Sequence, residues 1–89
     1  MPRRNDLHIC ADVLRVALTG ANKTRIVYQA NLNFKVVKKY LQRLLGNGLL
    51  QSTRDRRFIT TEKGLEFLKQ FEALVAPKME EQAVEGVRP

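Results

Sequence analysis

Residues 30–50, ANLNFKVVKKYLQRLLGNGLL, constrain the fold of this chain more than any other stretch. Asn33 suits a helix N-cap because its side chain accepts a hydrogen bond from a free amide of the first turn. The GNG at 46–48 is typical of a helix end because glycine tolerates the left-handed conformation. The apolar spacing predicts a helix over 34–45 with an inward face of Phe34, Val37, Leu41, Leu44 and Leu45, flanked by Val36 and Tyr40.

The outward face of this helix carries positive charge alone. Lys35, Lys39 and Arg43 lie four residues apart, and residues 34–45 contain no acidic side chain. Like charges at this spacing destabilise a helix slightly. These charges either form an ordinary solvated surface or face an anionic partner. The single sign and the missing acidic neighbours favour an anionic partner.

Positive charge is concentrated in the first two thirds of the chain. Residues 1–60 contain twelve Lys or Arg and three Asp or Glu, a net charge of +9, whereas residues 61–89 have a net charge of −2. We expect residues 1–60 to form the body that faces the partner, because a basic surface attracts nucleic acid. We expect a C-terminal helix over 61–76 and a tail or frayed extension over 77–89.

The flanking segments predict a helix-turn-helix followed by a β-hairpin. We expect a first helix over 6–19, capped by Asn5 and stopped by Gly20, and a short helix over 25–30 capped by Thr24. LLQST at 49–53 and RFIT at 57–60 predict two short strands joined by a turn at 54–56. The predicted fold class is therefore mainly α with a small β-hairpin, a winged helix-turn-helix with its wing at 49–60.

The predicted C-terminal helix begins at Thr61 and has a wider apolar face than a core-packing helix needs. This face either packs entirely on the first helix or also forms an interface with a second copy. We favour a homodimer. We expect Pro77 to end or kink the helix, since proline disfavours the helical conformation of the residue before it. The expected interface residues are Phe67, Leu68, Phe71, Leu74 and Val75.

Residues 23–74 resemble the small archaeal winged-helix proteins typified by a ten-kilodalton chromatin-associated DNA-binding protein. The resemblance lies in KTRIVYQANLNFKVVKKYLQRLLGNGLL and RFITTEKGLEFLKQF. Its specific features are Ala-Asn-Leu-Asn at 30–33, Lys-Lys-Tyr-Leu at 38–41, Gly-Leu at 48–49 and Thr-Glu-Lys-Gly at 61–64. It implies binding of double-stranded DNA. It also implies dimerisation through a long C-terminal helix, from which Pro77 is a departure.

The expected DNA interface consists of the predicted helix over 34–45, the wing and the start of the short helix. Residues on the N-terminal and outer face are expected to contact base edges, and others phosphate or the minor groove. Charge at the wing tip has a second interpretation, since it also prevents edge pairing with another chain. The expected base contacts are Asn33, Lys35, Val36, Lys39 and Gln42, and the expected backbone or minor-groove contacts are Lys38, Arg43, Arg54, Arg56, Arg57 and, more weakly, Arg25.

No motif predicts catalysis, a cofactor or a metal site. Cys10 is the sole cysteine and His8 the sole histidine, and the chain has neither a phosphate-binding loop nor a Ser-His-Asp set. No segment predicts a signal peptide or a membrane span, so we expect a cytoplasmic, nucleoid-associated protein.

We therefore predict a non-enzymatic protein that binds double-stranded DNA, sequence-specifically or sequence-tolerantly, as a transcriptional regulator or a chromatin-type protein. The alternative is a winged-helix interaction module that docks on an acidic protein, because the same fold serves both purposes. DNA binding requires the charges of the helix and the wing to form one continuous patch, whereas a protein partner does not.

Overall fold

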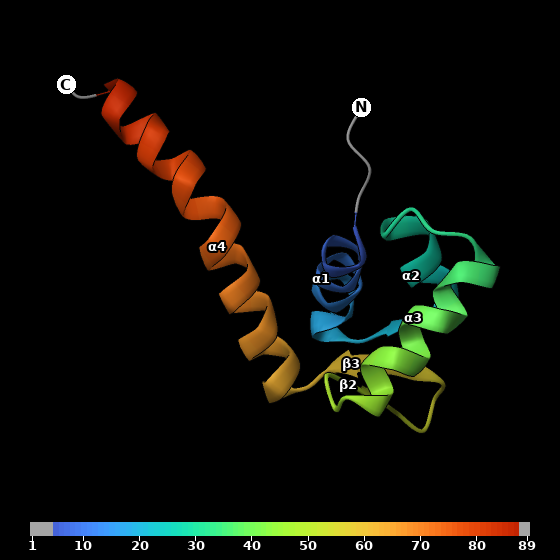
Figure 1. Cartoon of the computed structure of the whole chain (residues 1–89). Helices are drawn as coiled ribbons and strands as arrows, with labels where there is room; N and C mark the ends of the chain where they lie inside the picture. Colours follow the sequence, from blue (N-terminus) through green and yellow to red (C-terminus); the bar gives the residue numbers. More distant parts are fainter. Residues whose placement is uncertain (1–4, 88–89) are drawn as a thin grey trace.

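The predicted fold class is confirmed in a computed structural model that describes the backbone of residues 5–87 and the side chains of residues 5–75. Three short helices pack together, a small sheet lies below them, and a long helix projects away from this body (Figure 1). The elements are α1 (Asp6–Val16), the 3-10 helix η1 (Ala17–Thr19), β1 (Ala21–Asn22), α2 (Lys23–Gln29), α3 (Phe34–Gly46), β2 (Leu50–Ser52), β3 (Arg57–Thr60) and α4 (Glu62–Val87).

Asparagine side chains start each of the first three α-helices. Asn5 Oδ1 accepts from the His8 amide at 2.9 Å, and Asn33 Oδ1 accepts from the Val36 amide at 2.7 Å, so both predicted caps are confirmed. The prediction of Thr24 as the cap of α2 is wrong. Asn22 caps this helix by accepting from the Arg25 amide at 2.8 Å, because the extended backbone of β1 ends at Asn22 and α2 begins at the next residue, Lys23.

The ends of α2 and α3 are closed in the same way. Asn31 has a φ of 58°, and the next amide, Leu32 N, donates to Val27 O at 2.9 Å. Gly48 has a φ of 75°, and Leu49 N donates to the Leu44 carbonyl at 2.9 Å. A left-handed residue followed by a hydrogen bond between residues five positions apart satisfies the last free carbonyls of a helix. It fixes the four-residue turn at 30–33 before α3 and the exit from α3 into the wing.

The sheet has three antiparallel strands in the order β1-β3-β2. The two predicted strands are present, and Leu50 pairs with Thr60. The third strand, β1, was not predicted, because two residues are too few to show a periodic pattern; its Ala21 pairs with Phe58. The Thr60 hydroxyl donates to Leu14 O at 2.7 Å and ties the sheet to α1.

Two aromatic side chains of α3 exchange their expected positions. Phe34, predicted to face inward, is 49% exposed because the first residue of α3 extends beyond the core. Tyr40, predicted on a flank, is only 3% exposed, because its hydroxyl finds an acceptor on Asp6 at 2.6 Å and the ring is thereby free to be buried. The remaining core is contributed mainly by α1, α2 and α3, with Leu14, Ile26, Leu44, Val13 and Val37 its largest fully buried side chains.

The first turns of α4 are locked onto the body. The Thr61 hydroxyl accepts from the Gly64 amide at 3.0 Å and donates to Gly48 O at 2.7 Å. Leu68, two turns along the helix, is 3% exposed and belongs to the core. Further on, the rings of Phe71 and His8 meet edge to face with centroids 5.1 Å apart, so α1 and α4 also pack on each other.

The helix does not end at Pro77, because α4 continues to Val87. That part of the prediction is wrong. Proline removes one helical hydrogen bond and crowds the preceding turn, but Lys, Met, Glu and Gln follow it directly and are good helix formers. The tail expected over 77–89 is therefore helical as far as Val87, and residues 88–89 lie outside the described residues.

Candidate nucleic-acid interface

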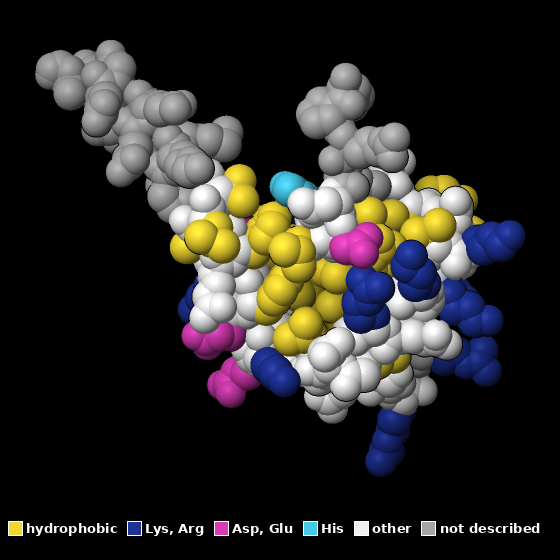
Figure 2. All heavy atoms as spheres, in the orientation of Figure 1, with side chains coloured by type: hydrophobic (Ala, Val, Ile, Leu, Met, Phe, Trp, Pro, Cys, Tyr) yellow, Lys and Arg dark blue, Asp and Glu magenta, His cyan; other side chains and the backbone are white. Residues whose placement is uncertain are grey.

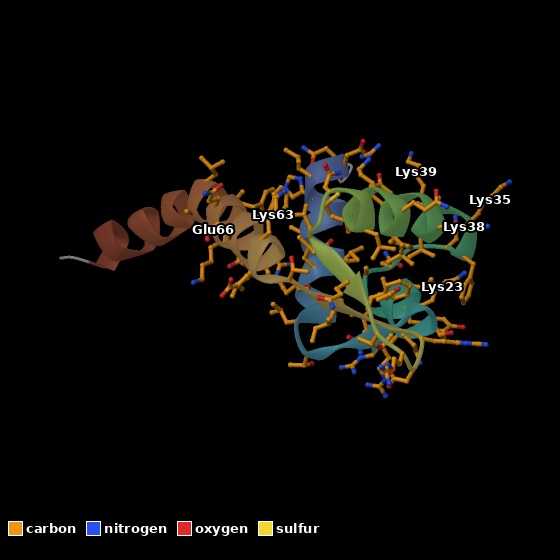
Figure 3. All side chains as sticks on the ribbon, turned by 90° about the horizontal axis from the view of Figure 1, so that it is seen from below. Lys23, Lys35, Lys38, Lys39, Lys63 and Glu66 are labelled. Carbon is orange, nitrogen blue, oxygen red and sulfur yellow. The ribbon has the colours of Figure 1, made fainter. Side chains whose placement is uncertain are left out.

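The outward face of α3 is basic and exposed. Lys35, Lys38, Lys39 and Gln42 are all exposed, and Figure 3 shows the three lysines projecting from the same helix. Among the described residues, no ion pair joins any of these lysines to an acidic side chain. The charge predicted for this face is therefore available to an anionic ligand.

The row of free charge is one residue shorter than predicted, because Arg43 has a partner from another element. Arg43 Nη1 lies 3.3 Å from Asp6 Oδ2, and the same carboxylate accepts from the Tyr40 hydroxyl. As predicted, α3 itself contains no acidic residue, but Asp6 at the start of α1 pairs with Arg43. Lys39 Nζ and the Arg43 guanidinium also lie 5.4 and 5.6 Å from the Tyr40 ring centroid.

The Asp6–Tyr40 hydrogen bond shifts the pKa values of both side chains. The bond from Tyr40, together with the one from Arg43, holds the pKa of Asp6 below its ordinary value. The same bond, together with burial, raises the pKa of Tyr40. Asp6 is thus the charged acceptor that joins the N-terminus of α1 to the middle of α3.

The start of α3 offers fewer polar groups to bases than predicted. Asn33 uses its side-chain oxygen as the helix cap, which leaves only its amide nitrogen for another contact. Val36 is half-buried and packs against the core. Phe34 is instead exposed there, beside Lys35.

The wing is a tight hairpin with a basic tip. Thr53 N donates to Arg57 O at 2.8 Å, and Arg56 N donates to Thr53 O at 3.3 Å. Arg56 has a φ of 63°, so the loop at 54–56 has the form of a turn followed by one left-handed residue. Of the three wing arginines, Arg57 lies 3.4 Å from Asp55, whereas Arg54 and Arg56 have no ion-pair partner among the described residues.

The start of α2 adds Lys23 to the predicted set. Arg25, predicted as a weak phosphate contact, is exposed as expected. Lys23 is exposed as well, and Figure 3 places it between α3 and the wing in that view. Lys23 was not predicted as a contact, because a helix capped by Thr24 would leave Lys23 in a connecting turn, whereas α2 begins at Lys23.

Apolar and basic side chains gather on different parts of the surface. Figure 2 shows apolar side chains between α1 and α4, and Lys and Arg side chains on the side that carries α3. A groove of about 320 Å³ lies in the apolar region. Its lining residues are Asp6, Leu7, Cys10, Arg43, Leu44, Asn47, Leu49, Lys63 and Phe67.

The predicted dimer-interface residues divide into two groups. Leu68 is buried in this chain's own core, so it is not available to a partner, because α4 turns it towards α1. Phe67 and Phe71 are half-buried against the core. Leu74 is 74% exposed and Val75 40% exposed, because they lie where α4 leaves the body.

Other kinds of site find little support in the described residues. They contain no group of three His, Cys, Asp or Glu side chains placed to hold a metal ion. Cys10 is buried, and burial raises the pKa of its thiol, which makes it a poor nucleophile. No helix in the described part of the chain has the length and apolar character needed to cross a membrane.

The wing, the turn and the exposed helix together define a winged helix-turn-helix protein. Residues 3–78 match the winged helix-turn-helix family, and the chain belongs to it. The chain is similar in structure to Sso10a-2, a DNA-binding protein from Sulfolobus solfataricus, with a TM-score of 0.74 and 29% identity over 97% of this chain and 99% of that one. It is also 32% identical over 63 residues to an uncharacterised protein of Methanocaldococcus jannaschii, covering 70% of this chain and 64% of that relative's length.

Proposed function

We propose that this protein binds double-stranded DNA by inserting α3 into the major groove, with the wing on the adjacent backbone or minor groove. The observation that carries the proposal is the exposed lysine face of α3, which has no acidic partner among the described residues. Membership of the winged helix-turn-helix family supports it, as does the similarity to a DNA-binding protein that covers nearly the whole chain.

The electrostatics of the face fit this role. Lys35 lies in the first turn of α3, where a cation meets the positive end of the helix dipole. Phosphate groups nearby remove this repulsion and release the counterions that they hold, which makes binding favourable at low salt. Lys38, Lys23 and Arg25 are proposed as backbone contacts, whereas Lys39 and Gln42 face outward enough to contact base edges.

Two predicted contacts take a different form in the proposal. Arg43 is engaged by Asp6, so it is proposed to reach phosphate only as an edge contact that shares this carboxylate. Arg54 and Arg56 are proposed as the wing contacts, and Arg57 as the residue that steadies the turn through Asp55. The protein is proposed to act without catalysis at the nucleoid, as a regulator or as a chromatin-type protein.

We also propose a homodimer formed through residues 61–76 of α4. The support is the apolar face of this helix, which continues past the body at Leu74 and Val75. Exposed apolar side chains in a row on a projecting helix are typical of an interface. A two-fold dimer would place two copies of α3 on one duplex.

The test is binding of a labelled random duplex of about 20 base pairs, followed by fluorescence anisotropy at low salt. The wild-type protein is compared with a Lys35→Ala, Lys38→Ala, Lys39→Ala triple variant, whose changes lie on exposed positions and leave the core intact. The matched control is Lys69→Ala, an exposed lysine of α4. We expect the triple variant alone to lose most of its affinity. Equal affinity of all three proteins would overturn the proposed role of α3.

A further inference from the structure

A large exposed apolar side chain lies at the N-terminal end of α3, at the edge of its basic face. Phe34 is the first residue of this helix and is about half exposed. Its neighbour Lys35, and Lys38 one turn further on, are exposed cations. In a helix-turn-helix, the N-terminal residues of the second helix are the ones that meet base edges. Phe34 therefore lies where a base contact is made.

The backbone that carries Phe34 is well fixed. Asn33 caps α3 through the Val36 amide, and the left-handed Asn31 turns the chain so that Leu32 N bonds Val27 O at 2.9 Å. Leu32 and Val36, on either side of Phe34, both pack against the core. The ring is thus attached to an ordered backbone, which reduces the conformational freedom that is lost on binding.

We propose that Phe34 contacts the C5-methyl group of thymine in the major groove and gives the protein a preference for duplexes that carry this methyl. The inference rests on the proposed DNA binding and deepens it. A phenyl ring has no hydrogen-bond donor or acceptor for the other base edges, and the thymine methyl is the apolar group that the major groove presents. The surrounding lysines bring the ring close by contacting phosphate.

The test compares two duplexes of the same A·T-rich sequence, one with thymine and one with deoxyuridine at every thymine position. These duplexes differ only in the methyl group. We expect the wild-type protein to bind the thymine duplex about fourfold more tightly for each methyl contacted, which corresponds to burial of one methyl-sized group. Phe34→Ala should bind both duplexes alike, and Phe34→Leu should retain part of the preference.

Lys38→Ala is the matched control, since it changes an exposed residue one turn from Phe34 that is proposed to contact the DNA backbone. It should weaken binding to both duplexes by the same factor and leave their ratio unchanged. A thymine preference that persists in Phe34→Ala would overturn the assignment to Phe34. Equal wild-type binding to the two duplexes, with a steep salt dependence, would overturn the inference while leaving the DNA-binding proposal standing. No binding to either duplex would overturn both.

Discussion

At the scale of single residues, Arg56 lies in a backbone conformation that favours glycine. Its φ of 63° lies in the left-handed region, which disfavours an L-residue by about 1–2 kcal/mol. This conformation belongs to the turn itself, which is closed by the bond from Arg56 N to Thr53 O. The guanidinium is thus presented at the wing tip at some expense of stability, as is common at functional positions.

Replacing Arg56 by glycine should separate stability from binding. Arg56→Gly relieves the backbone strain, so we expect the free energy of unfolding in urea to rise by about 1 kcal/mol. Duplex affinity should fall severalfold, because one charge leaves the wing. Arg54→Gly, at an ordinary backbone conformation, should weaken binding without the gain in stability. A more stable Arg56→Gly protein with wild-type affinity would show that the wing tip does not touch DNA.

Gly64 is needed for close packing of α4 against the sheet, and not for a turn. A Cβ at this position would lie 2.2 Å from Leu49 O and 2.7 Å from Thr60 Cγ2. Gly64→Ala must therefore shift α4 away from the sheet, and we expect it to destabilise the protein by about 2 kcal/mol or more. Gly46→Ala is the control, since nothing lies within 4 Å of its Cβ position, and its thermal midpoint should not fall. Equal midpoints for the two variants would contradict this packing.

At the scale of the elements, the Asp6–Tyr40 bond between α1 and α3 makes a contribution to stability that depends on pH. The pKa of Asp6 is lowered, so its contribution to stability is present above its unfolded value, about 3.9, and is lost as the pH falls through the folded value. The pKa of Tyr40 is raised, so its contribution is present below about 10 and is lost as the pH rises through the folded value.

Tyr40→Phe removes the hydrogen bond and keeps the ring. We expect the wild-type thermal midpoint to fall more steeply than that of Tyr40→Phe both below about pH 4 and above about pH 10. Tyr28→Phe, which alters an exposed tyrosine of α2, should follow the wild-type profile. Parallel profiles for wild type and Tyr40→Phe would contradict the assigned pKa shifts.

Local sequence signals predicted most of the helices and strands. The features that were not predicted depend on contacts between residues far apart in the sequence. Asn5, Asn33 and Gly48 act within one helical turn, so their roles were visible in the sequence. The pairing of β1 with β3 depends on residues more than thirty positions apart. The burial of Tyr40 likewise depends on the carboxylate of Asp6, 34 positions away in the sequence. Contacts of this kind produce no periodic pattern in the sequence, so they cannot be predicted from it in this way.

The candidate site was predictable in charge but not in detail. The spacing of Lys35, Lys38 and Lys39 sufficed to place them on the exposed face, because that face is opposite the core. The pairing of Arg43 with Asp6 was not predictable, because it joins two helices. The exposure of Phe34 was missed as well, since helical spacing does not reveal where a helix extends beyond its core.

At the scale of the whole molecule, α4 gives the chain an elongated shape, with extents of 51 × 30 × 19 Å. Leu74 and Val75 of this helix are exposed in the single chain. A second copy would cover this apolar surface. The proposed dimer and the proposed DNA surface therefore lie on different elements, α4 and α3, and are expected to be separable by mutation.

Leu74→Glu tests the dimer without disturbing the fold, because the side chain is exposed in the single chain. We expect the Leu74→Glu protein to sediment as a monomer, because a charge would be buried in the interface. Its circular dichroism spectrum should match that of the wild type. Phe71→Glu is less suitable, because Phe71 packs against His8 and the core. Leu18→Glu, an exposed leucine in η1, should remain dimeric. A dimeric Leu74→Glu protein would place the interface elsewhere.

The central claim is that the basic face of α3 and the wing bind the phosphates of duplex DNA. The most direct measurement is the affinity of the wild-type protein for a random duplex of about 20 base pairs at several salt concentrations. A dimer with roughly six to ten phosphate contacts should give a log–log slope of about −5 to −9. A slope near zero, or no binding at low salt, would contradict the claim and would favour an acidic protein as the partner of this surface.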